Sequence, residues 1–540
     1  MPFWQEFFWA LIVAEHINAY IVIITFMIPI FVFAKRQACF YATPESDFSI
    51  RRNTWILVAT FAFLSGDFWL FVLLSSISIL FFSLRDSNRL AMFCFLLFVV
   101  PPFEGDVSGF GVLHYLFSLN YPRLLSLLIL LPLYFKLKAD TTTKPFGRLF
   151  SDKCLLGFMV IPLVLQTLQM NDTLSNTLRS GFYSFLDIFL PYYVISRGIQ
   201  SWKAFRDTVI SLVLGIFFLA PIAVYEYLKS WLLYSSLPAA LGLQWRMGAY
   251  LARGDDVRAC AASGHALALG YLMVVALSLY SYVWRLMRET WFAWLGLLVL
   301  LAGIWAPVSR GPWLGALTGF AVMILTGPSP LKRLFKLLIF CSPVVAVLLL
   351  GPTGEKIISV LPFIGHVDEF NEIYRRRLFD ISLDVIGLNP FFGSFTYLQL
   401  PIMQSLKQGQ GIIDIVNSYI GVALTYGLVG LALFVGVFLG ALVAVCRGIR
   451  ASPVGSETHT LGRSLLATLV AVMVTIVGVS SINTIGIMNM VVVALCLSYG
   501  ELVARLGPME HRSGQPDDTE FSPRHESVSL SAEGRSHVVR

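Results

Sequence analysis

The stretch from Trp291 to Gly327, WFAWLGLLVLLAGIWAPVSRGPWLGALTGFAVMILTG, decides the fold. It holds two apolar runs, 291–307 and 312–327, which are separated by a turn of only a few residues. Runs of this length suit a bilayer core of about 30 Å, because an α-helix rises about 1.5 Å per residue. Only helices and closed barrels satisfy their backbone hydrogen bonds in lipid. The stretch therefore predicts two membrane-spanning helices joined by a tight turn.

The composition of the whole chain supports the same interpretation. Of its 540 residues, 57% are hydrophobic and 13% are charged, and the mean hydropathy is +0.74. Soluble chains carry roughly 25% charged residues, so this composition excludes an ordinary soluble domain. The seven cysteines form no CxxC pair and have no metal-ligand spacing, so we expect neither a zinc site nor a disulfide framework. No metal and no cofactor are expected.

Lysine and arginine concentrate in segments that alternate with pairs of apolar runs. The basic segments are 35–52, 85–89, 136–153, 197–206, 285–288, 332–336 and 447–463. The apolar pairs are 55–66 with 69–84, 90–103 with 121–136, 154–170 with 181–196, 208–226 with 263–283, 291–307 with 312–327, 336–352 with 413–446, and 463–479 with 484–502. Basic loops stay on the cytoplasmic side of a membrane, which explains the net charge of +7 without a nucleic-acid partner. The pattern predicts an all-α polytopic integral membrane protein with about 14 transmembrane helices.

The domain organisation follows from these spans. Residues 1–504 are expected to form the transmembrane domain. Within it, residues 7–34 are too long for one simple span and cross the membrane either once or as a bent pair. Residues 353–412 form a long, partly helical external loop, which we expect on the periplasmic side. Residues 505–540 change abruptly to serine, proline, glycine and mixed charge, which is typical of a disordered cytoplasmic tail.

The tight turn quoted above holds the first candidate site residue. Arg310 lies at the predicted external interface beside Pro312, which suits the first turn of the next helix. A helix N-terminus favours an anion and a guanidinium group offers a bidentate fork, so the turn predicts a phosphate or diphosphate site. Gly311, Gly315 and Gly319 repeat every fourth residue, which permits close helix packing beneath the site. The alternative is an interfacial arginine that snorkels above this packing stripe.

A second external segment carries Arg246, Arg253, Arg258 and His265. A solvated loop with internal ion pairs explains Arg246 and Arg253 as well as any function does. Arg258 and His265 lie where the apolar run 263–283 begins, which favours a functional role for both.

The long external loop holds a third polar region. Residues 369–385 place apolar side chains on one helical face; at about 100° per residue, Arg377 falls inside this face and Arg375 points away from it. Arg377 is therefore expected to approach the external mouth of the transmembrane domain, the alternative being a side chain that snorkels along the seam. Asp414 is a lone carboxylate at the start of a predicted membrane helix. It acts there either as an N-terminal cap or as a general base.

Five segments, taken in order, carry a resemblance to a known family. They are Val308-Ser-Arg-Gly-Pro-Trp-Leu-Gly315, the arginine-containing helix at 374–378, Asn389-Pro-Phe-Phe-Gly393, Asn417-Ser-Tyr-Ile420 and Tyr426-Gly-Leu-Val-Gly430. Together they resemble the O-antigen ligase/polymerase family of bacterial envelope glycosyltransferases, and most of all its exopolysaccharide-polymerase branch. The resemblance covers residues 240–450 well and the earlier spans only by topology.

The resemblance implies a metal-independent polymerase in the bacterial inner membrane. Such an enzyme transfers undecaprenyl-diphosphate-linked glycan repeat units onto a growing exopolysaccharide or O-antigen chain at the periplasmic face. Arg258 and Arg310 correspond to the family's arginines that engage the lipid diphosphate. The implied partners are the lipid-linked oligosaccharide, an acceptor glycan and the lipid bilayer, with a chain-length regulator and a flippase as further candidates.

One departure from the family pattern bears on the mechanism. Ligases of the family usually have His directly before the residue that Asn417 matches, and here that residue is Val416. The departure argues against a His-based ligase mechanism and favours a polymerase-like member, with Asp414 or His265 as a substitute. The candidate catalytic residues are Arg258, Arg310 and Asp414, and the candidate substrate-binding residues are Arg377, His265, Asn417 and Arg375.

Two other functions stay open. A ligase that transfers finished glycan to lipid A core or to protein differs only in its acceptor, which the sequence does not identify. A flippase or other transporter of lipid-linked glycan would place ionisable residues near the bilayer midplane, often on broken helices in repeated halves. The chain has few such residues, Asp67 and Asp187 with Glu226 at the end of a span, and no visible repeat. Its polar residues concentrate outside the spans, which favours an enzyme.

Overall fold

The computed structural model of the chain describes residues 2–41, 43–109, 111, 115–169, 173–245, 257–287, 289–332, 335, 339, 342, 369–407, 411–482 and 484–509. Several predictions concern residues outside these ranges: Arg246, Arg253, nearly all of the apolar run 336–352, the first part of the loop 353–412 and most of the tail 505–540.

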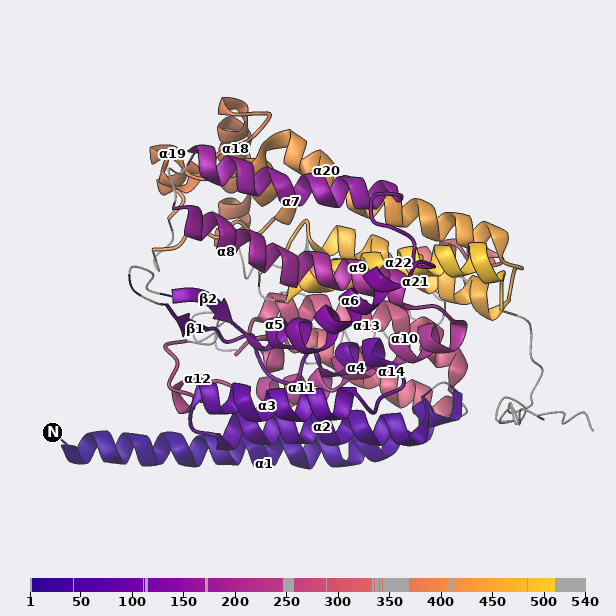
Figure 1. Cartoon of the computed structure of the whole chain (residues 1–540), viewed down its shortest axis with the longest axis horizontal. Coiled ribbons are helices and arrows are strands. Elements are labelled where there is room, and N and C mark those ends of the chain that lie inside the picture. The colour runs from indigo at the N-terminus through magenta and orange to yellow at the C-terminus, as the bar shows by residue number, and fades with distance from the viewer. Residues whose placement is uncertain are drawn as a thin grey trace, which may run out of the picture.

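The described chain is a bundle of helices with one small sheet (Figure 1). The helices are α1 (Pro2–Tyr41), α2 (Glu45–Leu64), α3 (Phe68–Ser83), α4 (Arg89–Leu96), α5 (Tyr121–Leu125), α6 (Leu131–Ala139), α7 (Phe150–Gln169), α8 (Leu174–Ser184), α9 (Leu190–Gly198), α10 (Trp202–Phe217), α11 (Leu219–Lys229), α12 (Leu237–Ala240), α13 (Ala266–Leu286), α14 (Thr290–Trp305), α15 (Arg310–Leu325), α18 (Glu369–Leu388), α19 (Pro401–Gln404), α20 (Ser418–Ala451), α21 (Glu457–Thr475) and α22 (Ile485–Leu506). Strands β1 (Gly105–Ser108) and β2 (Tyr115–Leu119) pair antiparallel between α4 and α5. This hairpin departs from the predicted all-α class, which expected only a connection here.

Seven described helical segments are long and apolar enough to cross a membrane, among them α1, α13 and α20. Three more, α3, α14 and α15, are apolar but shorter. In the most apolar 18-residue stretch of each helix, 28% of α1 is buried inside the protein and 89% of α13. Helix α1 therefore lies at the periphery of the bundle and α13 at its centre. Large apolar side chains such as Val32, which is 71% exposed, cover the outside of α1. A polytopic membrane protein is therefore plausible, in agreement with the prediction from sequence.

The N-terminal helices differ from the predicted loop pattern. Residues 7–34 belong to one continuous helix, α1, and the basic segment 35–52 is divided between α1 and α2. Arg51 is therefore not a loop residue. It is fully buried and forms ion pairs of 2.7 Å with both Asp86 and Asp207. Such pairing is what makes a buried guanidinium tolerable, and residue type alone does not reveal it.

The bundle has two different ends (Figure 1). Strands β1 and β2 lie with α12, α18 and α19 at one end, which we call the α18 end. At the opposite end, basic segments form ion pairs with neighbouring helices, Lys144 with Glu501 at 2.6 Å and Arg206 with Glu457 at 2.6 Å. We call this the basic end. The helices thus bring basic segments from distant parts of the sequence together.

The stretch that decided the fold has the predicted hairpin form, with α14 ending at Trp305 and α15 beginning at Arg310. Its glycines permit close helix packing. A Cβ atom at Gly319 would lie 2.7 Å from Oγ of Ser278 in α13 and 3.1 Å from Cβ of Ala471 in α21. The packing stripe predicted from the glycine repeat is therefore confirmed.

Candidate functional site

The N-termini of α13, α15 and α20 meet in one region. Helix α15 packs on α13 there, since a Cβ atom at Gly270 would lie 2.6 Å from Cγ of Pro312. Gly311 lies against Gly478, in the segment that follows α21. Ser418, the first residue of α20, donates its backbone N–H to the same segment at 3.0 Å. Each helix N-terminus carries a partial positive charge, so their convergence favours an anion.

Arg258 and Arg310 lie on two segments that run side by side in this region. Nε of Arg258 donates to the carbonyl oxygen of Pro307 at 3.0 Å, and the N–H of Ala259 donates to that of Ala306 at 3.2 Å. Arg310 follows directly as the first residue of α15. Both arginine side chains are half-buried. The structure thus brings together the two arginines that were predicted to engage a diphosphate.

Glu226 holds the segment that carries Arg258. Its buried carboxylate accepts three backbone N–H groups, from Leu233 at 3.0 Å, Cys260 at 2.9 Å and Ala261 at 2.8 Å. It therefore connects the end of α11 to both parts of the loop before α13. The sequence identified Glu226 only as a charge at the end of a span. Every residue except proline has a backbone N–H group, so residue types do not show which groups bond to Glu226. No sequence signal therefore pointed to this role.

Replacing Glu226 with alanine is expected to destabilise this region strongly. The three N–H groups would lose their acceptor in a buried place, and each unsatisfied group costs about 1–3 kcal/mol. We expect the free energy of unfolding to fall by about 3 kcal/mol or more, seen as a lower unfolding temperature of the purified protein. Glu15→Ala is the matched control, because Glu15 is exposed and bonds to Trp231 on the surface. Equal stability of the two variants would contradict the role of Glu226.

His265 is the N-cap of α13. Its Nδ1 accepts the backbone N–H of Leu267 at 3.2 Å, from which we infer that the neutral ring carries its proton on Nε2. Burial and the positive charge of Arg258 lower the pKa of His265 to about 4. At neutral pH the ring is therefore an uncharged hydrogen-bond donor. This state argues against His265 as the general base, one of the two substitutes that the sequence left open.

The lowered pKa of His265 predicts a loss of stability at mildly acidic pH. Between the ordinary value of 6.5 and the folded value of about 4, the unfolded chain binds a proton that the folded chain does not. The stability that the neutral His265 ring contributes to the folded protein is fully present above pH 6.5 and is lost as the pH falls towards 4. His265→Asn keeps a good N-cap and removes the titration, so its unfolding temperature should fall less over this range than that of the wild type. An identical pH dependence in both proteins would refute the assignment.

The start of α20 gives different roles to its two candidate residues. Asn417, not Asp414, is the N-cap, because its side-chain oxygen accepts two backbone N–H groups of the first turn at 2.9 and 3.2 Å. The Asp414 side chain reaches solvent and lies within electrostatic range of Arg258 and Arg375. The protein atoms packed around it raise the pKa of Asp414, and the two arginines oppose part of that rise. A raised pKa suits a general base, the other role expected for Asp414.

The arginines of α18 are arranged differently from the prediction. The expected apolar face included Ile373, but Ile373 is 66% exposed. Tyr374, on the same expected face, is buried as predicted, and its hydroxyl group bonds to the backbone N–H and carbonyl oxygen of Asp414 at 3.1 and 3.2 Å. Arg375 and Arg377 are both exposed. The positive charge of Arg375 acts on the Asp414 carboxylate, whereas Arg377 donates to a hydroxyl group at the C-cap of α19 at 3.4 Å. The described apolar side chains of the expected face are therefore packed except at Ile373, and Arg375 rather than Arg377 acts on Asp414.

Helix α20 is interrupted at Gly427, and the loop after α18 fills the interruption. Gly427 has φ 68° and ψ −172° inside an otherwise helical segment of 34 residues. The N–H of Leu428 donates to the carbonyl oxygen of Pro390 at 2.8 Å. Two of the stretches that carry the family resemblance, Asn389–Gly393 and Tyr426–Gly430, are therefore the two halves of one joint. This joint fixes the loop that bears α18 and Arg375 to a predicted membrane span.

No family model matches this chain, and no curated protein matches it. Across the residues that the structure describes, no group of three or more His, Cys, Asp or Glu side chains is arranged to hold a metal ion. The charged groups of the site are the arginines, the helix N-termini and Asp414.

Proposed function

We propose that this chain is a membrane glycosyltransferase of the polymerase type, which transfers glycan repeat units from an undecaprenyl diphosphate carrier to a growing exopolysaccharide or O-antigen chain. One observation carries the proposal: Arg258 and Arg310 lie on adjoining segments where the N-termini of three helices meet. A diphosphate presents several negatively charged oxygens. Arginine forks and helix N-termini are the groups that bind such oxygens best.

The proposed reaction is a direct displacement at the sugar. A hydroxyl oxygen of the acceptor glycan attacks the anomeric carbon of the donor, and the bond from that carbon to the diphosphate oxygen breaks. The lipid diphosphate leaves with the bonding electrons, and Arg258 and Arg310 stabilise the charge that develops on it. The hydroxyl proton passes to the Asp414 carboxylate, whose contact with solvent and raised pKa suit this task. Arginines, in place of a metal ion, neutralise the diphosphate in this scheme.

The orientation in the membrane follows from the basic segments. Basic loops mark the cytoplasmic side of many membrane proteins. The basic end therefore faces the cytoplasm and the α18 end faces the periplasm of a bacterial inner membrane, with about 14 spans in all. This orientation gives Arg258 and Arg310 access to lipid-linked substrates at the periplasmic face.

A transporter of lipid-linked glycan is the second candidate. Broken helices and buried charges are typical of transporters, and the chain has both, at Gly427 and at Arg51. The interruption at Gly427, however, is filled by the chain's own loop, which suits a structural joint better than an ion site. A ligase would carry out the same chemistry on a different acceptor.

Reconstitution distinguishes these candidates. Purified protein in lipid vesicles is mixed with lipid-linked repeat units isolated from the host strain, and the products are separated by length. A polymerase yields a ladder of longer glycans on the lipid carrier. A transporter moves the substrate across the vesicle without lengthening it, and a ligase yields product only when lipid A core or a protein acceptor is added. Either of these last two results would overturn the proposal.

A further inference from the structure

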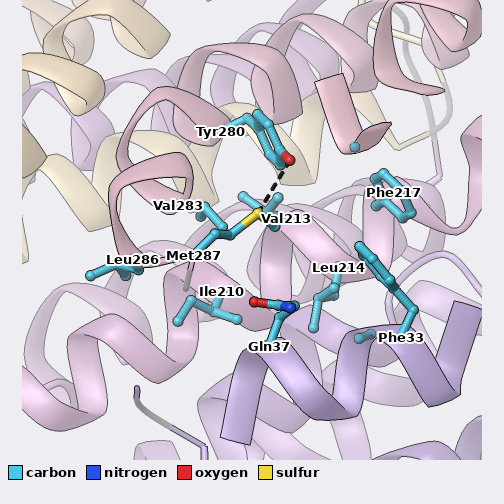
Figure 2. A pocket seen from close by; sticks show the side chains of 12 residues that line it. Phe33, Gln37, Ile210, Val213, Leu214, Phe217, Tyr280, Val283, Leu286 and Met287 are labelled. Carbon is cyan, nitrogen blue, oxygen red and sulfur yellow. Dashed lines mark hydrogen bonds between the residues drawn. The ribbon is translucent and has the colours of Figure 1, made fainter. Parts of the chain in front are cut away.

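An apolar cavity lies near the basic end, between α1, α10, α13 and α14 (Figure 2). Aliphatic and aromatic side chains form nearly all of its wall, among them Val213, Phe217 and Val283. Two polar side chains also line it. Tyr280 donates its hydroxyl to the carbonyl oxygen of Ala293 at 2.9 Å, so its donor is already used.

Gln37 is the second polar side chain, and Figure 2 shows its amide group among the apolar walls. Gln37 is only 9% exposed, and within the described part of the chain its Oε1 has no hydrogen-bond partner. A buried acceptor without a donor is unfavourable, whereas an apolar cavity by itself stays dry. The cavity therefore favours an occupant that is apolar and has one hydrogen-bond donor.

We propose that this cavity binds a phospholipid of the adjacent leaflet, with one acyl chain between α1 and α13 and a head-group N–H or O–H donating to Oε1 of Gln37. The surroundings fit a lipid. Helix α1 is peripheral and its Val32 is 71% exposed, so the cavity borders the bilayer. Lys35 and Arg36 precede Gln37; Lys35 pairs with Glu45, and Arg36 pairs with Glu289 at 3.0 Å. The Arg36 side chain stays 66% exposed, so its remaining N–H donors can reach a lipid phosphate. The isoprenoid tail of the carrier lipid carries no donor, and in the proposed reaction its head group lies at the opposite, α18 end, so this lipid does not satisfy Gln37. This inference is independent of the proposed function.

Native mass spectrometry of the purified full-length protein tests the proposal. The protein is incubated with equal amounts of phosphatidylethanolamine and phosphatidylcholine that carry identical acyl chains; only the first has an N–H donor. We expect the wild type to retain phosphatidylethanolamine about five-fold better, the effect of one hydrogen bond. Gln37→Leu, which keeps the size of the side chain, should retain both lipids equally. Gln200→Leu, at an exposed glutamine of the basic end, should keep the preference.

A second variant tests the cavity itself. Leu214 lines the wall and is half-buried, so Leu214→Trp fills space that the acyl chain would occupy. It should lower the retention of both lipids. The proposal is overturned if the wild type retains both lipids equally, if Gln37→Leu keeps the preference, or if a folded Leu214→Trp protein retains lipid as well as the wild type.

Discussion

Arg310→Ala is expected to lower the rate of glycan polymerisation by about 10²- to 10³-fold, the usual loss when one group that stabilises transition-state charge is removed. Arg310 is the first residue of α15, and a positive charge there is opposed by the helix's own N-terminal charge. Removing it therefore costs the helix no favourable dipole interaction, so the variant should still fold and reach the membrane. The measurement is the glycan ladder formed by equal amounts of purified wild type and variant.

Two further variants make this prediction specific. Arg376→Ala removes an exposed arginine from α18 and changes the net charge at the same end equally, so it should polymerise at the wild-type rate. Arg310→Lys keeps the charge but loses the bidentate fork, so its rate should lie between those of wild type and Arg310→Ala. Near-normal glycan length with Arg310→Ala would refute the assignment of Arg310 to the diphosphate site. The enzymatic proposal would then have no support.

Those features that depend on residue type and spacing could be predicted from the sequence. The hairpin of α14 and α15, the glycine stripe at Gly315 and Gly319 and the gathering of basic segments at one end all follow from apolar runs, small residues and charge. The adjacency of Arg258 and Arg310 was expected from the family resemblance, which implies that both engage one lipid diphosphate.

Other features depend on backbone groups or on the choice between similar neighbours, and these could not be predicted. Glu226 bonds to N–H groups, which every residue except proline supplies. Asp and Asn are equally good N-caps, so the sequence could not decide between Asp414 and Asn417. The packed face of α18 excludes Ile373, and Arg375 rather than Arg377 acts on Asp414. In each case the deciding information is a backbone position, not a residue type.

Gly427→Ala is expected to have the largest effect on stability of any single change in α20. The combination φ 68° and ψ −172° belongs to a region that only glycine occupies readily. A Cβ atom at this position would also overlap the carbonyl oxygen of Phe391. The joint would then open, because its bonds join Leu428 to Pro390 and Ser394 to Leu424 across the interruption. We expect the free energy of unfolding to fall by about 3 kcal/mol or more, measured as thermal unfolding of the purified protein.

The same helix supplies a matched control. A Cβ atom at Gly421 would meet only Ile415, at an ordinary distance of 3.6 Å, so Gly421→Ala should be neutral or slightly stabilising. Gly393 occupies the other half of the joint with φ +63°, and a Cβ atom there would lie 2.6 Å from the backbone nitrogen of Gly427. Gly393→Ala should therefore destabilise the protein as Gly427→Ala does. Since the joint also anchors the loop that bears α18, both variants should lose activity together with stability. If Gly427→Ala unfolded at the same temperature as Gly421→Ala, the loop would not be anchored in this way, and Arg375 would lose its structural reason to lie beside Asp414.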